Sequence, residues 1–284
     1  MFNILVSGSD GFVAKYLIPA LSENKTYKII KMNRSSGDIA IRNTWKNLSA
    51  ANALIHLAGK NSVPESLKKP NDYINTNVMG TMMALEYCRA NNTKFIMLSS
   101  AYLYGNPDKL PTDETTNLKI TNPYVLSKKL SEDLCNFYSK HYGINVIILR
   151  LFNVYGLGQN KSTLIPTILN QVNLNTKIIV NDLEIKRDLI YVLDLVDVII
   201  KSIDLECNFE IINIGSGISY SIPEIIQIIQ KIKKTNLSVE SREIKRPHEI
   251  LHTQSDIAKA KKVLKWQPAW SLEKGLRDII NKND

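Results

Sequence analysis

Short apolar runs alternate with amphipathic segments through the first half of this 284-residue chain. The runs are rich in Ile, Val and Leu, and they lie at 3–7, 27–32, 53–58, 94–99 and 145–151. Apolar runs without polar alternation are typical of strands that are buried on both faces, as in a parallel sheet. Between them, three segments place apolar residues at helical spacing: 12–23, 72–91 and 124–142. The alternation therefore predicts an α/β fold of the Rossmann type, with a doubly wound parallel sheet.

The composition agrees with a globular domain, since 44% of the residues are hydrophobic and 22% are charged. The formal charge of +9 raises the question of nucleic acid. The lysines are dispersed, however, and the group at Lys231, Lys233 and Lys234 ends an amphipathic helix, where cations are expected. We therefore predict no nucleic-acid partner. A basic surface also suits a small anionic substrate such as a diphosphate.

Cysteine spacing and hydropathy limit which other classes of protein are possible. Cys88, Cys135 and Cys207 lie far apart and match no metal-ligand spacing, so we expect reduced thiols, a cytoplasmic protein and no metal site. The first two fall at apolar positions of expected helices and are predicted to be core residues. No apolar run is long enough to span a bilayer, because Arg150 interrupts even the run around it. The N-terminus enters a strand at once and has no basic region or cleavage site, so we expect no signal sequence. We expect no association with membranes.

A glycine turn follows the first apolar run, with the pattern Gly8-x-x-Gly11-x-x-Ala14. Gly8 permits a tight turn, Gly11 lets the backbone approach a pyrophosphate, and a small third residue lets helix and strand pack closely. The turn predicts a dinucleotide cofactor, bound by Gly8 and Gly11 together with Asp10, Phe12 and Val13.

The end of the second expected strand bears on the choice of cofactor. A carboxylate at this place would hold the adenosine ribose, but the chain has Asn33 and Arg34. These residues leave room for a 2′-phosphate, with Arg34 as its charged partner. The pattern favours NADP(H), while NAD(H) stays possible, and Arg34 as an ordinary surface arginine is the alternative.

Tyr124 and Lys128 are four positions apart on one expected helix face. A lysine at this spacing can lower the pKa of the phenol and so assist proton transfer. The preceding apolar run ends in Ser99 and Ser100. A glycine turn, a strand ending in serine and a Tyr–Lys helix follow one another in this order, and together they indicate a function that the Tyr–Lys pair alone would not.

With these residues in place, the chain resembles the extended short-chain dehydrogenase/reductase family, of the NAD-dependent epimerase/dehydratase type that modifies nucleotide sugars. The resemblance runs through nearly the whole chain. It is carried by His56-Leu57-Ala58-Gly59, Asn77-Val78-Met79-Gly80-Thr81, Ser99-Ser100-Ala101-Tyr102-Leu103-Tyr104-Gly105, Tyr124 with Ser127, Lys128 and Glu132, Arg150-Leu151-Phe152-Asn153-Val154-Tyr155-Gly156, Arg187-Asp188, Asn213-Ile214-Gly215-Ser216-Gly217 and Arg246-Pro247.

The resemblance implies roles for particular residues. Ser100, Tyr124 and Lys128 would be catalytic. The cofactor site would include Leu57, Ala58, Gly59, Asn77 and Ser99, besides Tyr124 and Lys128. The nucleotide-sugar substrate would contact Ser62, Tyr102, Asn153, Arg187 and Arg246, with Asn153 and the two arginines facing its diphosphate. A local surface ion pair is the alternative for Arg187 and Asp188.

The looser second half predicts a smaller C-terminal α/β lobe. Helices are expected near 162–173, 194–203 and 224–233, a strand at 209–214, and a last helix capped by Ser271. We expect 1–155 to form the dinucleotide-binding domain, 185–215 to return to it, and 156–284 to form mainly the substrate-binding lobe. The family resemblance also implies a homodimer that pairs through the helices at 72–91 and 124–142.

The reaction depends on residues next to the catalytic serine. A 4,6-dehydratase of this family would need an Asp-Glu pair directly after Ser100, and a 3,5-epimerase would need a cysteine two positions after it. The chain has Ala101 and Tyr102 there, so neither chemistry is expected.

Two reactions with hydride transfer at sugar C4 remain. One is a 4-ketoreductase of an NDP-4-keto-6-deoxy sugar, favoured by Asn33-Arg34 and the compact length. The other is a 4-epimerase of the UDP-galactose 4-epimerase type, favoured by the segment 58–77. A non-catalytic dinucleotide-binding protein is a third reading, but such proteins usually lose the tyrosine or the lysine, and this chain keeps both.

Overall fold

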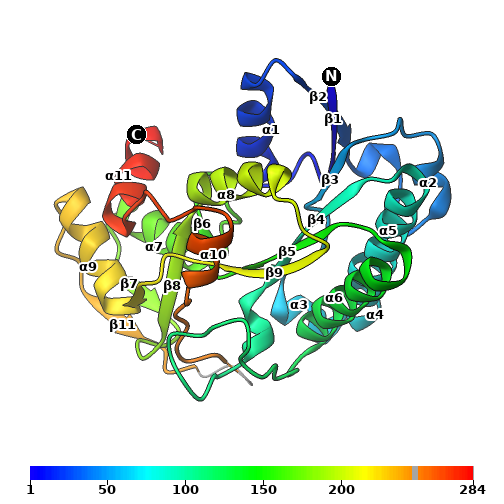
Figure 1. The fold of residues 1–284 in the computed structure, drawn as a ribbon. Coiled ribbons are helices and arrows are strands. Elements are labelled where there is room, and N and C mark those ends of the chain that lie inside the picture. The colour runs from blue at the N-terminus through cyan, green and yellow to red at the C-terminus, as the bar shows by residue number, and fades with distance from the viewer. Residues whose placement is uncertain (245–248, 284) are drawn as a thin grey trace.

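A six-stranded sheet, parallel throughout, forms the centre of the molecule (Figure 1). The computed structural model describes residues 1–244 and 249–283. The strand order is β2-β1-β3-β4-β5-β9. Their bounds are Phe2–Ser7 (β1), Tyr27–Met32 (β2), Ala53–His56 (β3), Lys94–Ser100 (β4), Val146–Leu151 (β5) and Phe209–Ile214 (β9). The predicted Rossmann-type α/β fold is confirmed.

Helices cover both faces of this sheet, because successive strand residues point to opposite sides. Ile4 and Val6 pack with α1 (Ala14–Glu23), α8 (Val192–Asp204) and α10 (Ala258–Val263). Leu5 points the other way, into a core shared with α2 (Arg42–Lys46), α5 (Gly80–Asn91) and α6 (Pro123–Tyr142). Cys88 and Cys135 lie fully buried in this second core, as predicted.

A smaller lobe with its own core lies beside the sheet (Figure 1). Its apolar residues come mainly from α7 (Leu164–Asn173), α9 (Ile222–Lys233) and α11 (Leu272–Asn283), packed on short strands. These strands form a three-stranded sheet, β10 (Ser219–Ser221), β8 (Lys186–Tyr191) and β6 (Asn153–Tyr155), and a pair, β11 (Val239–Ser241) and β7 (Ile178–Val180). Ser221 and Glu224 form a capping box at the start of α9. Most of these strands have three residues, which is too short for a periodicity signal. They were therefore not predicted from the sequence.

The order of the central strands identifies where a ligand binds. The chain leaves β1 toward β2 on one side and later continues through β3 on the other, so the two directions separate between β1 and β3. Ligands of such sheets bind in the crevice at the carboxyl ends of these strands. Gly8 follows β1 with a φ of +73°, and a Cβ there would lie 2.7 Å from the backbone nitrogen of Ala58, which follows β3. Only glycine allows this approach.

The segment predicted as one helix over 72–91 is interrupted. After α3 (Val63–Lys68) and α4 (Pro70–Tyr73), a π-helical turn, Ile74–Met79, leads into α5. Such single π turns often mark functional sites. This one carries Asn77, whose backbone carbonyl accepts a hydrogen bond from Ser131 of α6 at 3.0 Å.

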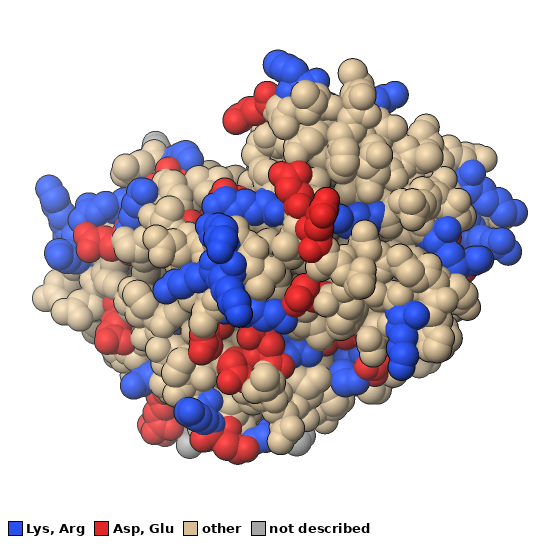
Figure 2. All heavy atoms as spheres, in the orientation of Figure 1, with Lys and Arg blue, Asp and Glu red and all other residues tan. Residues whose placement is uncertain are grey.

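The surface charge is mixed. On the face in Figure 2, Lys and Arg side chains are interspersed with Asp and Glu. Elsewhere in the structure too, opposite charges pair, as in Lys177–Glu240 at 2.7 Å. Among the described residues, no helix has the length and apolarity needed to cross a membrane.

Candidate active site

Ser100 and Tyr124 meet at the carboxyl end of β4. Ser100 is the last residue of that strand, and Tyr124 lies in the first turn of α6. The helix begins there because the Asn122 side chain accepts a hydrogen bond from the backbone N–H of Val125 at 3.0 Å, and Pro123 suits the first turn. Both side chains are buried, and Ser100 lies close enough to the Tyr124 phenol to influence its pKa.

Burial controls the protonation of the Tyr–Lys pair. It raises the pKa of Tyr124 to about 12, against the opposing influence of Ser100, and lowers the pKa of Lys128 to about 8, against the charge of Glu132. We expected Lys128 to lower the pKa of Tyr124. Instead, the Lys128 Nζ donates to the carbonyl of Leu98 at 2.9 Å. The raised pKa keeps the Tyr124 phenol protonated at neutral pH, so the phenol can act as a proton donor.

A buried ion pair next to the Tyr–Lys pair connects α6 to β5. Arg150 of β5 donates two hydrogen bonds to Glu132 of α6, at 3.0 and 2.7 Å, and the same carboxylate accepts from Ser99 at 2.6 Å. Arg150 also donates to the hydroxyl of Tyr104, which donates to Asn213 of β9 at 2.7 Å. The network fastens α6 to three strands. Roles for Tyr104 and Asn213 were not predicted from the sequence, because their hydrogen bonds form only when the strands lie side by side.

The residues predicted for the cofactor turn divide into two groups. Gly8 and Gly11 lie at the switch point of the sheet, and the buried hydroxyl of Ser9 between them has no hydrogen-bond partner in the described chain. Asp10 is exposed. Phe12 points into the core of the smaller lobe, where its ring meets Tyr16 edge-on at 5.9 Å, and Val13 packs against the first core.

This turn fits the pyrophosphate of a dinucleotide. Its backbone is close to Ala58, its glycines leave the approach free, and the unsatisfied Ser9 hydroxyl is a donor for a phosphate oxygen. Leu57 packs against the first core and leads into Ala58 and Gly59 at the end of β3.

Asn33 and Arg34 lie in a short 3-10 turn directly after β2. The Asn33 side chain caps this turn by accepting from the backbone of Ser35 at 3.0 Å. Arg34 is exposed and makes no ion pair with any described residue. The turn therefore presents a free guanidinium where the adenosine end of a dinucleotide would lie.

Asn77 joins the loop after β3 to α6. Its carboxamide accepts from Lys60 N at 2.8 Å and donates to the Lys60 carbonyl at 3.0 Å and to Ser127 Oγ at 2.8 Å. Gly59 is close to both Asn77 and Lys128, since a Cβ there would lie 3.0 Å from Asn77 Oδ1 and 3.7 Å from Lys128 Nζ. Asn77 thus places the end of β3 against α6.

Two residues predicted for the substrate contact each other across the lobes. The Tyr102 hydroxyl donates to Asn153 Oδ1 at 3.4 Å, and Asn153 Nδ2 donates to the Asp188 carbonyl and to Thr253 Oγ1 at 3.2 and 3.3 Å. Ser62 lies at the start of α3, where its hydroxyl accepts from Glu65 N at 3.3 Å. Its carbonyl also accepts from Tyr73, whose ring stands edge-on to Tyr124 at 6.3 Å.

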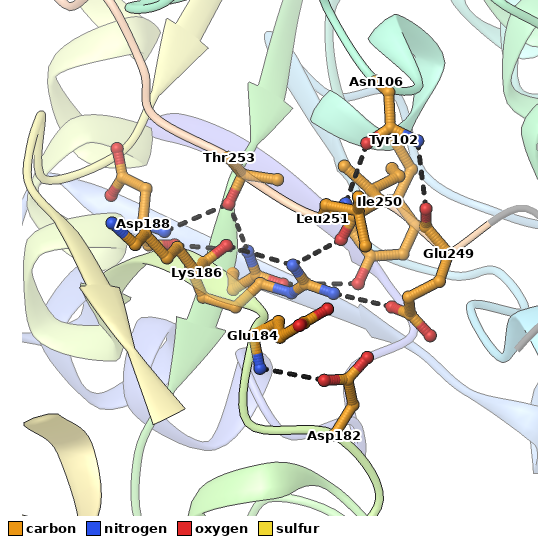
Figure 3. Close-up of polar contacts among 12 residues, drawn as sticks. Tyr102, Asn106, Asp182, Glu184, Lys186, Asp188, Glu249, Ile250, Leu251 and Thr253 are labelled. Atoms are coloured by element: carbon orange, nitrogen blue, oxygen red, sulfur yellow. Dashed lines mark hydrogen bonds and ion pairs between the residues drawn. The ribbon is translucent and has the colours of Figure 1, made fainter. Parts of the chain in front are cut away.

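Arg187 and Asp188 do not pair with each other, so the surface ion-pair interpretation is wrong. Both are buried, because neighbouring residues of β8 point to opposite sides. Arg187 donates to Glu249 and to the Ile250 carbonyl, each at 2.6 Å (Figure 3). The Asp188 carboxylate accepts instead from the backbone and hydroxyl groups of Ser216 and Ser255. Arg246, also predicted for the substrate, lies outside the described residues.

The segment 249–256 connects the two lobes (Figure 3). On one side it is held by β8, through the contacts of Arg187 and Asp188. On the other side, the Asn106 side chain donates to the Glu249 carbonyl at 3.0 Å and accepts from Leu251 N at 2.8 Å. Asn106 and Glu249 were not predicted from the sequence, because no local pattern marks contacts between residues that are so far apart in the chain.

Comparison with known proteins agrees with this geometry. The model of the NAD dependent epimerase/dehydratase family matches residues 4–215. The chain belongs to this family. A putative UDP-glucose 4-epimerase of Methanocaldococcus jannaschii is 30% identical, over 98% of this chain and 97% of that protein. The GDP-6-deoxy-D-mannose reductase of Pseudomonas aeruginosa is 26% identical, over 98% and 96%.

Solved structures of family members superpose closely on this chain. RMD from Pseudomonas aeruginosa, complexed with NADPH, has a TM-score of 0.91 at 25% identity and covers 99% of this chain and 98% of its own. The UDP-glucose 4-epimerase of Thermotoga maritima, with UDP-glucose, has the same score and identity and covers 99% of both chains. The family relatives thus include both epimerases and reductases of nucleotide sugars, and a pyridine nucleotide cofactor is supported.

Proposed function

We propose that this protein is an NADPH-dependent reductase of an NDP-4-keto-6-deoxy sugar. The observation that carries the proposal is the turn after β2, where a free, exposed Arg34 stands in place of a carboxylate. An arginine there suits the 2′-phosphate of NADP, whereas a carboxylate suits the ribose of NAD. A reductase must exchange its cofactor in every turnover, and an epimerase keeps it. A site that recognises the 2′-phosphate of NADPH therefore favours the reductase.

The residues of the first domain would hold the cofactor along the edge of the sheet. The turn at Gly8 and Gly11 would bind the pyrophosphate, with Ser9 as an additional donor, and Arg34 would bind the 2′-phosphate. Lys128, beside Gly59, would hold the nicotinamide ribose. The bound nicotinamide supplies the hydride.

Side chains of the protein orient the substrate and transfer the proton. Ser100 hydrogen-bonds the C4 oxygen of the sugar and orients it toward Tyr124. As that oxygen gains negative charge, the protonated phenol of Tyr124 donates its proton to it. The high pKa of Tyr124 matches this direction of the reaction, in which the phenol starts as an acid.

The diphosphate of the substrate would lie in the smaller lobe, between Asn153 and Arg187. Because Glu249 already neutralises Arg187, we expect the phosphate to share this guanidinium with Glu249 or to displace it. Arg246 is proposed for the same subsite from the resemblance alone.

A 4-epimerase is the second candidate. It is supported by the 30% identity to the putative UDP-glucose 4-epimerase, and Ser100, Tyr124 and Lys128 would serve it equally well. It requires a cofactor that remains bound through both hydride transfers.

The cofactor content of the purified protein separates the two functions. We expect mass spectrometry after denaturation to find no retained NAD(H), and titration to show tighter binding of NADPH than of NADH. Arg34→Ala should abolish the preference for NADPH and leave NADH binding unchanged, while Arg242→Ala, at an exposed arginine of the other lobe, should change neither. Stoichiometric NAD(H) in the purified protein would refute the reductase and support the epimerase.

A further inference from the structure

Tyr102 differs from its neighbours in the 3-10 turn Ala101–Tyr104. The side chains of Ala101, Leu103 and Tyr104 are buried beneath the turn, whereas Tyr102 is only partly buried. Its backbone N–H donates to Ser100 Oγ at 3.2 Å, so its position is tied to the residue predicted to orient the reacting oxygen.

One part of the phenol contributes to an apolar wall beside Tyr124. Tyr102 packs against the cluster of Tyr73, Leu103, Tyr124 and Val125, with Val63 and Leu118 at its margin. At its Tyr73 edge the cluster meets charged side chains, because the Tyr73 hydroxyl donates to Glu65 and Lys60 Nζ lies 5.6 Å from the centre of the Tyr73 ring. Next to Tyr124, the Tyr102 ring and the Leu103 and Val125 side chains supply apolar surface.

The hydroxyl end of Tyr102 reaches the other lobe. Its bond to Asn153 is long, at 3.4 Å, while Asn153 is fixed by two further bonds to β8 and Thr253. Tyr102 thus extends from the Ser100–Tyr124 pair to the proposed diphosphate subsite. A hexosyl ring with its C4 oxygen at Tyr124 and its phosphate near Asn153 must lie along this phenol.

We infer that Tyr102 is a specificity-determining residue that selects a 6-deoxy sugar over one with a hydroxymethyl or carboxylate group at C6. The inference rests on the proposed function. The groups that flank C4 on a hexose are the C3 hydroxyl and the substituent of C5, which carries C6. Of these, only a C6 methyl group is satisfied by an apolar aromatic wall, because a hydroxyl or carboxylate there would lose water without gaining a partner.

The expected discrimination is moderate for a hydroxyl and larger for a carboxylate. An apolar pocket rejects an added hydroxyl by up to about 100-fold. An ionised carboxylate has a much higher cost of desolvation, so a uronic acid should bind more weakly still.

Binding of a matched pair of ligands tests the inference without relying on turnover. GDP, UDP and dTDP are first titrated into the wild type with NADPH present, and the tightest one defines the nucleotide. Its hexose and 6-deoxyhexose derivatives, for example GDP-mannose and GDP-6-deoxymannose, are then compared by calorimetry. We expect the wild type to bind the 6-deoxy sugar between about 10- and 100-fold more tightly.

Three variants test whether the ring of Tyr102 causes the preference for the 6-deoxy sugar. Tyr102→Phe should retain it, because the aromatic wall remains. Tyr102→Thr should bring the two affinities close together, and Tyr102→Gln, which keeps a long side chain but replaces the ring by an amide, should favour the C6 hydroxyl. Tyr142→Thr, at an exposed tyrosine of α6, is the control and should behave as the wild type.

Equal affinities in the wild type, or a preference that survives in both Tyr102→Thr and Tyr102→Gln, would overturn the inference. Loss of the preference in Tyr102→Phe would assign it to the hydroxyl and contradict the role of the ring. Failure of the proposed function gives a different result, since a wild type that interconverts NDP-hexoses with retained NAD(H) refutes the reductase whatever the ratio of affinities.

Discussion

At the scale of single residues, burial determines which protonation states the site offers. The same desolvation that raises the pKa of Tyr124 lowers the pKa of Lys128, because burial opposes the charged form of each group. The neutral phenol, next to Ser100, is therefore the favoured form of Tyr124. A second buried group, His56, follows the same rule beneath the cofactor turn, where its Nδ1 lies 2.8 Å from Ser7 Oγ.

Removing the Tyr124 hydroxyl should abolish turnover and leave the cofactor bound. Tyr124→Phe keeps the ring in the apolar cluster but removes the proton donor, so we expect kcat to fall by about 10²- to 10⁴-fold. NADPH affinity, measured by fluorescence titration, should not change. Tyr142→Phe is the matched control. If Tyr124→Phe retained wild-type kcat, Tyr124 would not be the acid.

His56 should make the protein sensitive to mild acid. Burial lowers the pKa of His56 from 6.5 to about 3, so the unfolded chain takes up a proton near pH 6.5 and the folded chain does not. The free energy of unfolding should thus fall as the pH decreases from 6.5 toward 3, by at most about 5 kcal/mol in total.

Urea denaturation between pH 7 and pH 5 measures this effect before most carboxylates titrate. His56→Gln should be less stable at pH 7 but should lose less stability on acidification. His141→Gln, at an exposed histidine of α6, should show the wild-type dependence. A wild-type stability that stays constant from pH 7 to pH 5 would contradict the prediction.

At the scale of elements, α6 is held by polar contacts as well as by its apolar face. The Glu132–Arg150 pair connects α6 to β5, and Asn77 connects it to the loop after β3. Glu132 lies about one turn after Lys128, and Ser127, which contacts Asn77, is next to Lys128. These contacts fix Tyr124 and Lys128 relative to the strand ends.

Breaking the buried pair should cost much more than breaking a surface pair on the same helix. Glu132 and Arg150 are each 5% exposed, so Glu132→Gln leaves an uncompensated buried guanidinium, and we expect a loss of about 3–5 kcal/mol. Lys129 and Asp133 are 33% and 56% exposed, and Asp133→Asn should cost less than about 0.5 kcal/mol. Urea denaturation gives both values. Equal losses in the two variants would show that Glu132 does not carry the predicted structural role.

At the scale of the whole molecule, α6 leaves apolar side chains in contact with solvent. Leu130 and Phe137 are 37% and 49% exposed, and Leu126 is also exposed on the same face of this helix. Isolated exposed apolar residues are common, but several on one helix are typical of an interaction surface. This is the surface on which the predicted homodimer would form.

Placing charges on this surface should separate the subunits. We expect the wild type to be a dimer by light scattering after size exclusion, and the double variant Leu130→Glu, Phe137→Glu to be a monomer, because a dimer would bury its new carboxylates. Leu174→Glu introduces a charge at a residue that is 65% exposed in the smaller lobe, and it should remain dimeric. A monomeric wild type would contradict the predicted dimer.

The local pattern of the sequence was sufficient for the central sheet, since buried parallel strands and amphipathic helices have distinct periodicities. It also singled out Gly8, Ser100, Tyr124 and Lys128, whose chemistry is visible in short motifs. The tertiary structure alone decided the surroundings of these residues. It showed that Arg187 pairs with Glu249, that Tyr102 reaches Asn153, and that the pKa of Tyr124 is raised rather than lowered. The reason is physical: burial and long-range contacts depend on which segments become neighbours, and a local pattern contains no information about neighbours that are distant in the chain.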